Sequence, residues 1–167
     1  MPCPAVTQAV YLETAVLYLV RHAEAGDKRA WTGPDAQRPL TPIGWRQAHG
    51  LSAHLDGHPI TTIVSSPARR CLQTVAPLAQ QRTLGVRADA RLLVDGDAGD
   101  ALRLLWEAPD GALWCTHGEL IGEVLARLRA RGAPIGPAPE YAKGSIWHLD
   151  VIAGGVVSAH YRPPANR

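Results

Sequence analysis

The 167-residue sequence predicts an α/β fold, a three-layer sandwich in which helices cover both faces of a mostly parallel central sheet. Short apolar or β-branched runs, typical of strands buried on both faces, alternate with stretches whose apolar residues recur at helical spacing. Several of these runs end abruptly in polar residues. The length suits one compact domain, and 46% hydrophobic residues are ordinary for a protein with a buried core.

The first elements follow from runs of residues near the N-terminus. The apolar run 15–20 predicts a strand that ends in Arg21 and His22. Residues 23–40 are rich in Gly, Pro and charge, which indicates a loop. A Thr-Pro pair then predicts the start of a helix over about 41–55, because Thr is a good N-cap and Pro fits the first helical position. The apolar stripe of this helix comprises Ile43, Ala48, Leu51 and Leu55.

The rest of the chain continues the alternation. A β-branched strand at 61–65 leads into a helix that opens at Ser66 and Pro67, and 84–88 is a candidate third strand. The remaining expected elements are a weak helix at 98–107, a strand at 112–116, a helix at 120–128 and a closing hairpin at 145–151 and 156–161.

Composition excludes several classes of protein. A net charge of +2 argues against a polyanion or nucleic-acid binder. Cys3, Cys71 and Cys115 are odd in number and lack CxxC spacing, which disfavours a disulfide framework or zinc knuckle. No apolar run approaches the roughly 20 residues that span a bilayer. Residues 1–14 contain no Lys or Arg, so a secretory signal is not expected, and we expect a cytoplasmic protein that does not bind membranes.

Three expected strands end in side chains suited to an anion. The first ends in Arg21 and His22, the second leads through Ser66 to Arg70, and the fourth ends just before His117. Open α/β sheets bind ligands beyond the carboxyl ends of their strands, so these side chains are expected to meet. Arginine matches phosphate oxygens in pairs, and a neutral imidazole can attack phosphorus. The pattern predicts a phosphoryl-transfer site that needs no metal and no cofactor.

Four segments resemble the motifs of a known family. LVRHAEA at 19–25 and LTPIGWRQA at 40–48 resemble the first-histidine signature of the histidine phosphatase superfamily and its following helix. SSPARRCLQT at 65–74 and CTHGE at 115–119 resemble its arginine and second-histidine segments. The motifs stand in family order, and the resemblance, which implies a phosphoglycerate mutase-like fold, runs from residue 16 to about 160.

The resemblance implies roles for individual residues. His22 is the expected nucleophile, and Arg21, Arg70 and His117 complete the phosphate pocket. Arg70, rather than its neighbour Arg69, fills the family position because of its register in the SSPxxRxxQT pattern. The phosphatase domain is expected over residues 15–161, after an extension at 1–14 and before a tail at 162–167.

The chain most resembles the SixA-type branch, the phosphohistidine phosphatases. The resemblance lies in its short length, the RHA form of its first motif and the lack of a large insertion after the second strand. Arg38-Pro39-Leu40 and KGSIW at 143–147 also resemble the phosphatase domain that follows a Nudix domain in MutT-type hydrolases. The expected function is removal of phosphate from phosphohistidine on a partner protein. The alternatives are a phosphatase for nucleotides, dinucleoside polyphosphates or other small phosphorylated metabolites, and a non-catalytic phosphate-binding module.

The proton donor is the weakest part of the resemblance. Larger members of the superfamily carry a glutamate between the second arginine and second histidine motifs, but LLVDGD at 92–97 contains none. Asp95 or Asp97 is the candidate acid, with Asp95 the first choice, and a turn is the alternative, since Asp-Gly is a common turn dipeptide. A phosphoramidate leaves readily once its nitrogen is protonated, whereas an alkyl ester needs an acid near its leaving oxygen. A missing acid therefore favours phosphohistidine as substrate.

Further polar side chains surround the expected pocket. Glu119 is expected to stabilise a helix N-terminus and Glu24 to lie on the loop. Trp31 either stacks on a nucleotide base or packs against its own loop. The cations of the 23–40 loop form either a rim that attracts substrate or a solvated surface. The candidate substrate-binding residues are Lys28, Arg29, Arg38, Ser66 and Lys143.

Overall fold

The computed structural model describes residues 13–165. Cys3 and nearly all of the expected extension at 1–14 lie outside the described residues, as do the last two positions of the expected tail at 162–167. Within the described part of the chain, no helix is both long enough and apolar enough to cross a bilayer.

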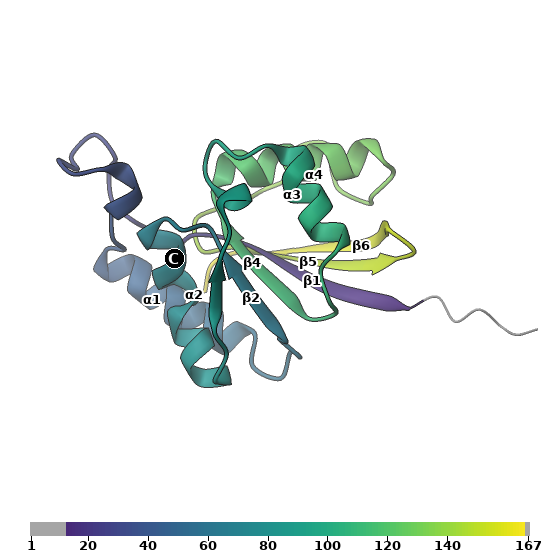
Figure 1. Ribbon diagram of the computed structural model, residues 1–167, viewed down its shortest axis with the longest axis horizontal. Helices are drawn as coiled ribbons and strands as arrows, with labels where there is room; N and C mark the ends of the chain where they lie inside the picture. The colour runs from purple at the N-terminus through teal and green to yellow at the C-terminus, as the bar shows by residue number, and fades with distance from the viewer. Residues whose placement is uncertain (1–12, 166–167) are drawn as a thin grey trace, which may run out of the picture.

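In the described part of the chain, six strands form one sheet, with bounds close to those expected. They are β1 Thr14–Arg21, β2 Thr62–Ser65, β3 Val86–Ala88, β4 Ala112–Thr116, β5 Ile146–Ile152 and β6 Gly155–Arg162. The order across the sheet is β3-β2-β4-β1-β5-β6. The first four strands in this order are parallel, and β5 and β6 add an antiparallel hairpin beside β1 (Figure 1). The carboxyl ends of β1, β4 and β2 therefore lie next to one another.

Helices cover both faces of this sheet, which confirms the predicted α/β sandwich. Their bounds are α1 Pro42–His54, α2 Arg69–Arg82, α3 Ala98–Trp106 and α4 Gly118–Ala130, with short 3-10 helices η1 Asp35–Gln37 and η2 Ala90–Leu92. The pairs α1/α2 and α3/α4 lie on opposite sides of the sheet (Figure 1). Leu17 and Leu19 pack with α3 and α4, whereas Tyr18 and Val20 pack with α1 and α2. Successive strand residues face opposite ways, so one apolar run serves both cores.

Helix α1 differs from the expected stripe at one position. Its buried residues follow helical spacing from Gly44 through Ala48 to Leu51, but Ile43 is 50% exposed because it lies one residue off this stripe. Gly44 is required there, since a Cβ atom would lie 2.0 Å from the carbonyl oxygen of Glu24. The close approach presses α1 against the loop that follows β1, and this loop carries His22.

Candidate active site

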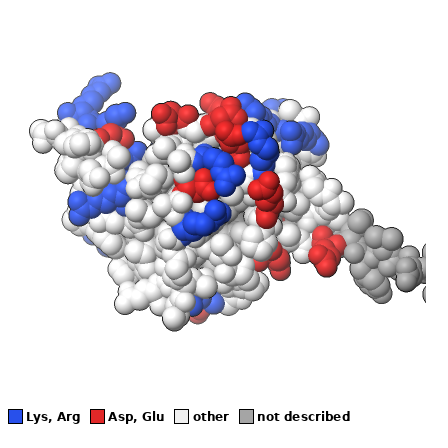
Figure 2. All heavy atoms as spheres, in the orientation of Figure 1, with Lys and Arg blue, Asp and Glu red and all other residues white. Residues whose placement is uncertain are grey.

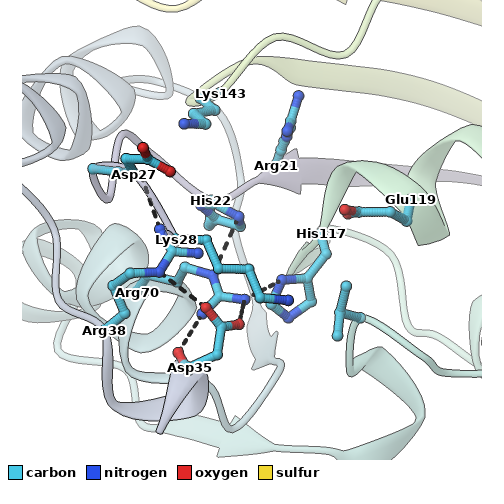
Figure 3. A pocket seen from close by; sticks show the side chains of 12 residues that line it. Arg21, His22, Asp27, Lys28, Asp35, Arg38, Arg70, His117, Glu119 and Lys143 are labelled. Atoms are coloured by element: carbon cyan, nitrogen blue, oxygen red, sulfur yellow. Dashed lines mark hydrogen bonds and ion pairs between the residues drawn. The ribbon is translucent and has the colours of Figure 1, made fainter. Parts of the chain in front are cut away.

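Side chains from three strand ends meet in one charged pocket of about 300 Å³ (Figure 3). Arg21 and His22 come from the end of β1, Arg70 from the first turn of α2, and His117 directly follows β4. The ring centroids of the two histidines lie 5.3 Å apart. Between them, Arg70 places Nε 3.3 Å from Nε2 of His22 and Nη2 3.2 Å from Nδ1 of His117. Arg69, by contrast, is exposed on α2.

Hydrogen bonds fix the proton of His22 on one ring nitrogen. Nδ1 lies 2.8 Å from the carbonyl oxygen of Ala23, while Nε2 faces the donating Nε of Arg70. A guanidinium group can only donate, so Nε2 carries the lone pair and Nδ1 carries the proton. The pKa of His22 is lowered to about 3, chiefly by burial; the hydrogen bond to the Ala23 carbonyl raises the pKa, and the charges of His117, Arg70 and Arg21 lower it. The imidazole is therefore neutral, and its Nε2 is unprotonated and lies in the pocket.

Polar residues of the other motifs hold the backbone after His22. The side-chain oxygen of Gln47, from α1, accepts from the amide of Glu24 at 2.8 Å. The hydroxyl of Thr74, from α2, accepts from the amide of Ala23 at 2.9 Å. Two helices thus position the segment that carries the histidine, which explains why the motifs contain glutamine and threonine at these places.

Arg21 is held by α4 and by the segment before β5. Its Nη1 donates to the carbonyl oxygen of Tyr141 at 2.9 Å. The guanidinium packs against Gly118, where a Cβ atom would lie 2.7 Å from Cζ. Its buried Nε has no hydrogen-bond partner among residues 13–165. Since buried donors are ordinarily paired, this nitrogen and the uncapped N-terminus of α4 are suited to hold an anion.

Asp35 is a pocket residue that the sequence analysis missed. Its carboxylate lies 3.0 Å from Nη2 of Arg70 and 2.9 Å from Nε of Arg38, and its carbonyl oxygen accepts from Nη1 of Arg70 at 2.7 Å. Partial burial raises the pKa of Asp35, but the hydrogen bond from Arg38 and the charge of Arg70 outweigh it and lower the pKa. The spacing of three residues between Asp35 and Arg38 was the only signal in the sequence, and it does not point to Arg70.

The candidate cations of the rim have different surroundings. Lys28 and Lys143 line the pocket, and Nζ of Lys143 pairs with Glu24 at 3.0 Å. Arg38 also lines it but is only 8% exposed and donates to two loop carbonyls, so it fastens the loop. Arg29 is exposed and does not line the pocket. Of the two alternatives for the loop cations, a substrate-attracting rim or a solvated surface, Arg29 fits the solvated surface.

The expected acid does not reach the pocket. Asp95 is exposed, and its neighbour Val94 lines the cavity instead. Asp97 caps α3 by accepting from two backbone amides. Glu119 does line the pocket, and its carboxyl group points into it (Figure 3). Trp31 packs within its own loop, where its indole N–H donates to a backbone carbonyl at 3.0 Å.

Two buried side chains, those of Ser66 and Cys71, contact Nε2 of His117. The hydroxyl of Ser66 lies 2.9 Å from Nε2, and Sγ of Cys71 lies 3.6 Å from the same nitrogen. Because Arg70 donates to Nδ1, a neutral His117 carries its proton on Nε2 and donates to Ser66. The contact of Cys71 with His117 was not expected from the sequence.

The charge around the site is mixed. On the face drawn in Figure 2, Lys and Arg lie interspersed with Asp and Glu, and no broad surface of one sign appears there. This distribution agrees with the small net charge of +2 and suits a small local anion better than an extended polyanion.

Comparisons with known proteins agree with this geometry. An 8-oxo-(d)GTP phosphatase of Mycolicibacterium smegmatis is 31% identical over 161 residues, which are 93% of this chain and 50% of that protein. The chain thus spans about half the length of this relative. A solved structure of a candidate phosphohistidine phosphatase SixA from Nakamurella multipartitia is 25% identical, with a TM-score of 0.73 over 92% of this chain and 98% of that one.

A second solved structure, the protein histidine phosphatase SixA with tungstate, has a TM-score of 0.71 and 22% identity over 88% of this chain and 94% of that one, and it shows the shared fold. The family model of the histidine phosphatase superfamily (branch 1) matches residues 17–100. Since that match covers half of the sequence, the chain belongs to the histidine phosphatase superfamily (branch 1).

Proposed function

We propose that the protein hydrolyses phosphoryl compounds in two steps through a phosphohistidine on His22. The observation that carries this proposal is the bare Nε2 of a neutral, buried imidazole, which lies 3.3 Å from the guanidinium of Arg70. A histidine nucleophile must be uncharged at the attacking nitrogen, and this one is held in that state by its surroundings.

In the first step, Nε2 of His22 forms a bond to phosphorus as the bond to the leaving group breaks. Arg21 and Arg70 donate to the phosphoryl oxygens, over which the negative charge of the transition state is spread. The Nδ1 proton, shared with the Ala23 carbonyl, stabilises the phosphorylated ring. In the second step, water attacks phosphorus as the P–Nε2 bond breaks. Inorganic phosphate leaves with both protons of this water, and the imidazole returns to its starting tautomer.

The proposed substrate is phosphohistidine on a protein. The likeness to the SixA structure over nearly the full length of both chains supports it. The chemistry also supports phosphohistidine as substrate, because its imidazole leaves easily as a neutral group once the ring is protonated. Nucleotides and other small phosphorylated metabolites are the second candidate class, favoured by the 31% identical relative, whose printed name specifies 8-oxo-(d)GTP. A binding-only module is the weakest alternative, since binding needs no bare nucleophile.

Trapping the intermediate tests the mechanism. Brief incubation with labelled phosphoimidazole, followed by alkaline denaturation, is expected to leave acid-labile label on His22. His22→Asn is expected to abolish both labelling and turnover. His49→Asn, a matched change at an exposed histidine of α1 outside the pocket, is expected to retain both. Turnover that survives in His22→Asn would contradict the proposal.

A substrate panel tests the substrate class. We expect kcat/KM to be highest for a phosphohistidine peptide, compared with nucleoside phosphates, dinucleoside polyphosphates and sugar phosphates. If a nucleotide has the highest kcat/KM, the second class replaces the first while the His22 chemistry stands.

A further inference from the structure

Three carboxylates line the pocket, and two of them are committed elsewhere. Asp35 is paired with Arg70 and Arg38, which hold it as an anion. Asp27 accepts from a backbone amide two residues further on, at 2.9 Å, within its own loop. Glu119 makes no hydrogen bond or ion pair with another side chain in the described part of the chain, so it is the carboxyl group free to exchange a proton.

The position of Glu119 places this group beside the reacting centre. It is the second residue of α4, only two positions after His117. Figure 3 shows its side chain extending from α4 with the carboxyl end aimed at the space that Arg21, His22 and His117 border. Because Glu119 is also exposed, water can exchange its proton between turnovers.

We propose that Glu119 is the proton donor to oxygen leaving groups, an inference that rests on the proposed function of His22. As Nε2 bonds to phosphorus and the P–O bond breaks, the carboxylic acid of Glu119 transfers its proton to the departing oxygen, which leaves as a neutral alcohol. In the second step the Glu119 carboxylate takes a proton from the attacking water. Phosphate is released, and both side chains return to their starting forms.

This role extends the substrate class. Asp95, the residue expected from the sequence, lies outside the pocket, so without Glu119 the site could act only on groups that leave without an acid nearby. With Glu119 in place, the pocket accepts phosphate monoesters of alcohols, including nucleoside and sugar phosphates, as well as phosphoramidates.

The experiment compares leaving groups in Glu119→Gln. For an alkyl phosphate, whose leaving alkoxide needs a proton, kcat/KM is expected to fall on the order of 100-fold. For p-nitrophenyl phosphate and phosphoimidazole, which leave without help from a carboxyl group, a change of about threefold or less is expected. Glu119→Asp keeps the acid on a shorter side chain and is expected to recover part of the alkyl phosphate activity.

Two variants serve as controls. Glu123→Gln removes an exposed carboxylate one turn further along α4, outside the pocket, and is expected to leave all three rates unchanged. Asp95→Asn is expected to do the same. An equal loss for all three substrates in Glu119→Gln, no loss at all, or a loss confined to alkyl phosphates in Asp95→Asn overturns the role of Glu119, as does wild-type protein that does not hydrolyse alkyl phosphates. Absence of label on His22 from phosphoimidazole instead overturns the proposed function itself.

Discussion

The imidazole of His22 shows how neighbouring groups set the chemistry of a single residue. The residue is 6% exposed, and its ring donates to one carbonyl and faces cationic groups. Burial and the neighbouring cations each disfavour a second proton on the imidazole. The Ala23 carbonyl accepts from Nδ1 and so keeps the first proton on that nitrogen. In the proposed mechanism, the nucleophile is therefore neutral and oriented before any substrate binds.

The titration of His22 can be measured directly. NMR of the imidazole nitrogens is expected to show the Nδ1–H tautomer from neutral pH down to about pH 4.5, with a pKa of about 3 in place of the usual 6.5. His22→Asn assigns the signal. A midpoint near the usual value, or a proton on Nε2, would contradict the arrangement described.

Gly118 controls the position of the neighbouring arginine. Gly118→Ala would place a methyl group 2.7 Å from Cζ of Arg21, and the guanidinium must move away. The end of a long side chain can shift cheaply, so the free energy of unfolding is expected to change by less than about 1 kcal/mol.

Phosphoenzyme formation, in contrast, is expected to slow at least on the order of 10-fold in Gly118→Ala, because Arg21, the arginine proposed to bind the phosphoryl oxygens, is displaced. Stopped-flow labelling and urea unfolding check the two halves of this prediction. Gly85→Ala, where a Cβ atom meets nothing within 4 Å, is the matched control. Equal phosphoenzyme rates in the two alanine variants would show that Arg21 does not need this space.

Among the elements, the 23–40 loop is held both by contacts within itself and by a contact to α2. Gly and Pro predict its irregular backbone, but its shape comes from Arg38, which donates to two loop carbonyls, and from η1, which brings Asp35 to Arg70. The loop thereby links the first motif to α2. Helix ends matter in the same way, since α4 begins directly after His117 and its first turn lies at the pocket.

The carboxylate at the N-terminus of α3 has a structural role. Asp97 accepts from the amides of Gly99 and Asp100 at 2.8 and 3.0 Å. Asp97→Ala is expected to lower the free energy of unfolding by about 1 kcal/mol, as for the loss of other N-caps, with kcat/KM unchanged. Urea unfolding and steady-state kinetics measure the two effects. Asp95→Ala, at an exposed residue, is expected to change stability by less than about 0.5 kcal/mol. A loss of turnover in Asp97→Ala with stability intact would refute the capping role.

For the whole molecule, the perturbed groups predict that acid destabilises the fold. Between its folded pKa of about 3 and the usual 6.5, His22 binds a proton in the unfolded chain but not in the folded one. Its contribution to stability is complete above about pH 6.5 and is lost as the pH falls toward 3. The lowered pKa of His58 acts in the same direction, and the lowered pKa values of carboxyl groups extend the loss to more acidic pH. These carboxyl groups are Glu24, Asp35 and Asp89.

Unfolding at several pH values measures this dependence. The His22 share amounts to about 2.5 kcal/mol between about pH 7.5 and 4.5. His22→Asn is expected to flatten the curve by that amount over this range, whereas His49→Asn, at an exposed position, keeps the larger part of the wild-type slope. A wild-type slope in His22→Asn would mean that His22 is not buried in its neutral form.

Strand positions, the start of α1 and the pocket residues Arg21, His22, Arg70 and His117 could be inferred from the chain alone, whereas α2 begins at Arg69, after the Ser66-Pro67 start that the sequence predicts. Such features depend on local patterns: apolar runs, capping pairs and motif spacing act over a few residues. The general rule for open α/β sheets then places strand ends together without knowledge of the exact strand order.

Asp35, the fastening role of Arg38 and the place of Glu119 emerged only from the tertiary structure. Asp35 meets Arg70 across 35 positions of chain, and the direction of its side chain depends on how η1 packs. Asp95 and Glu119 are both acidic residues close to motif segments, and no periodicity tells which of them faces the pocket. That choice is made by the turn before α3, which places Val94 at the cavity and Asp95 in solvent, and by α4, whose first turn aims Glu119 inward.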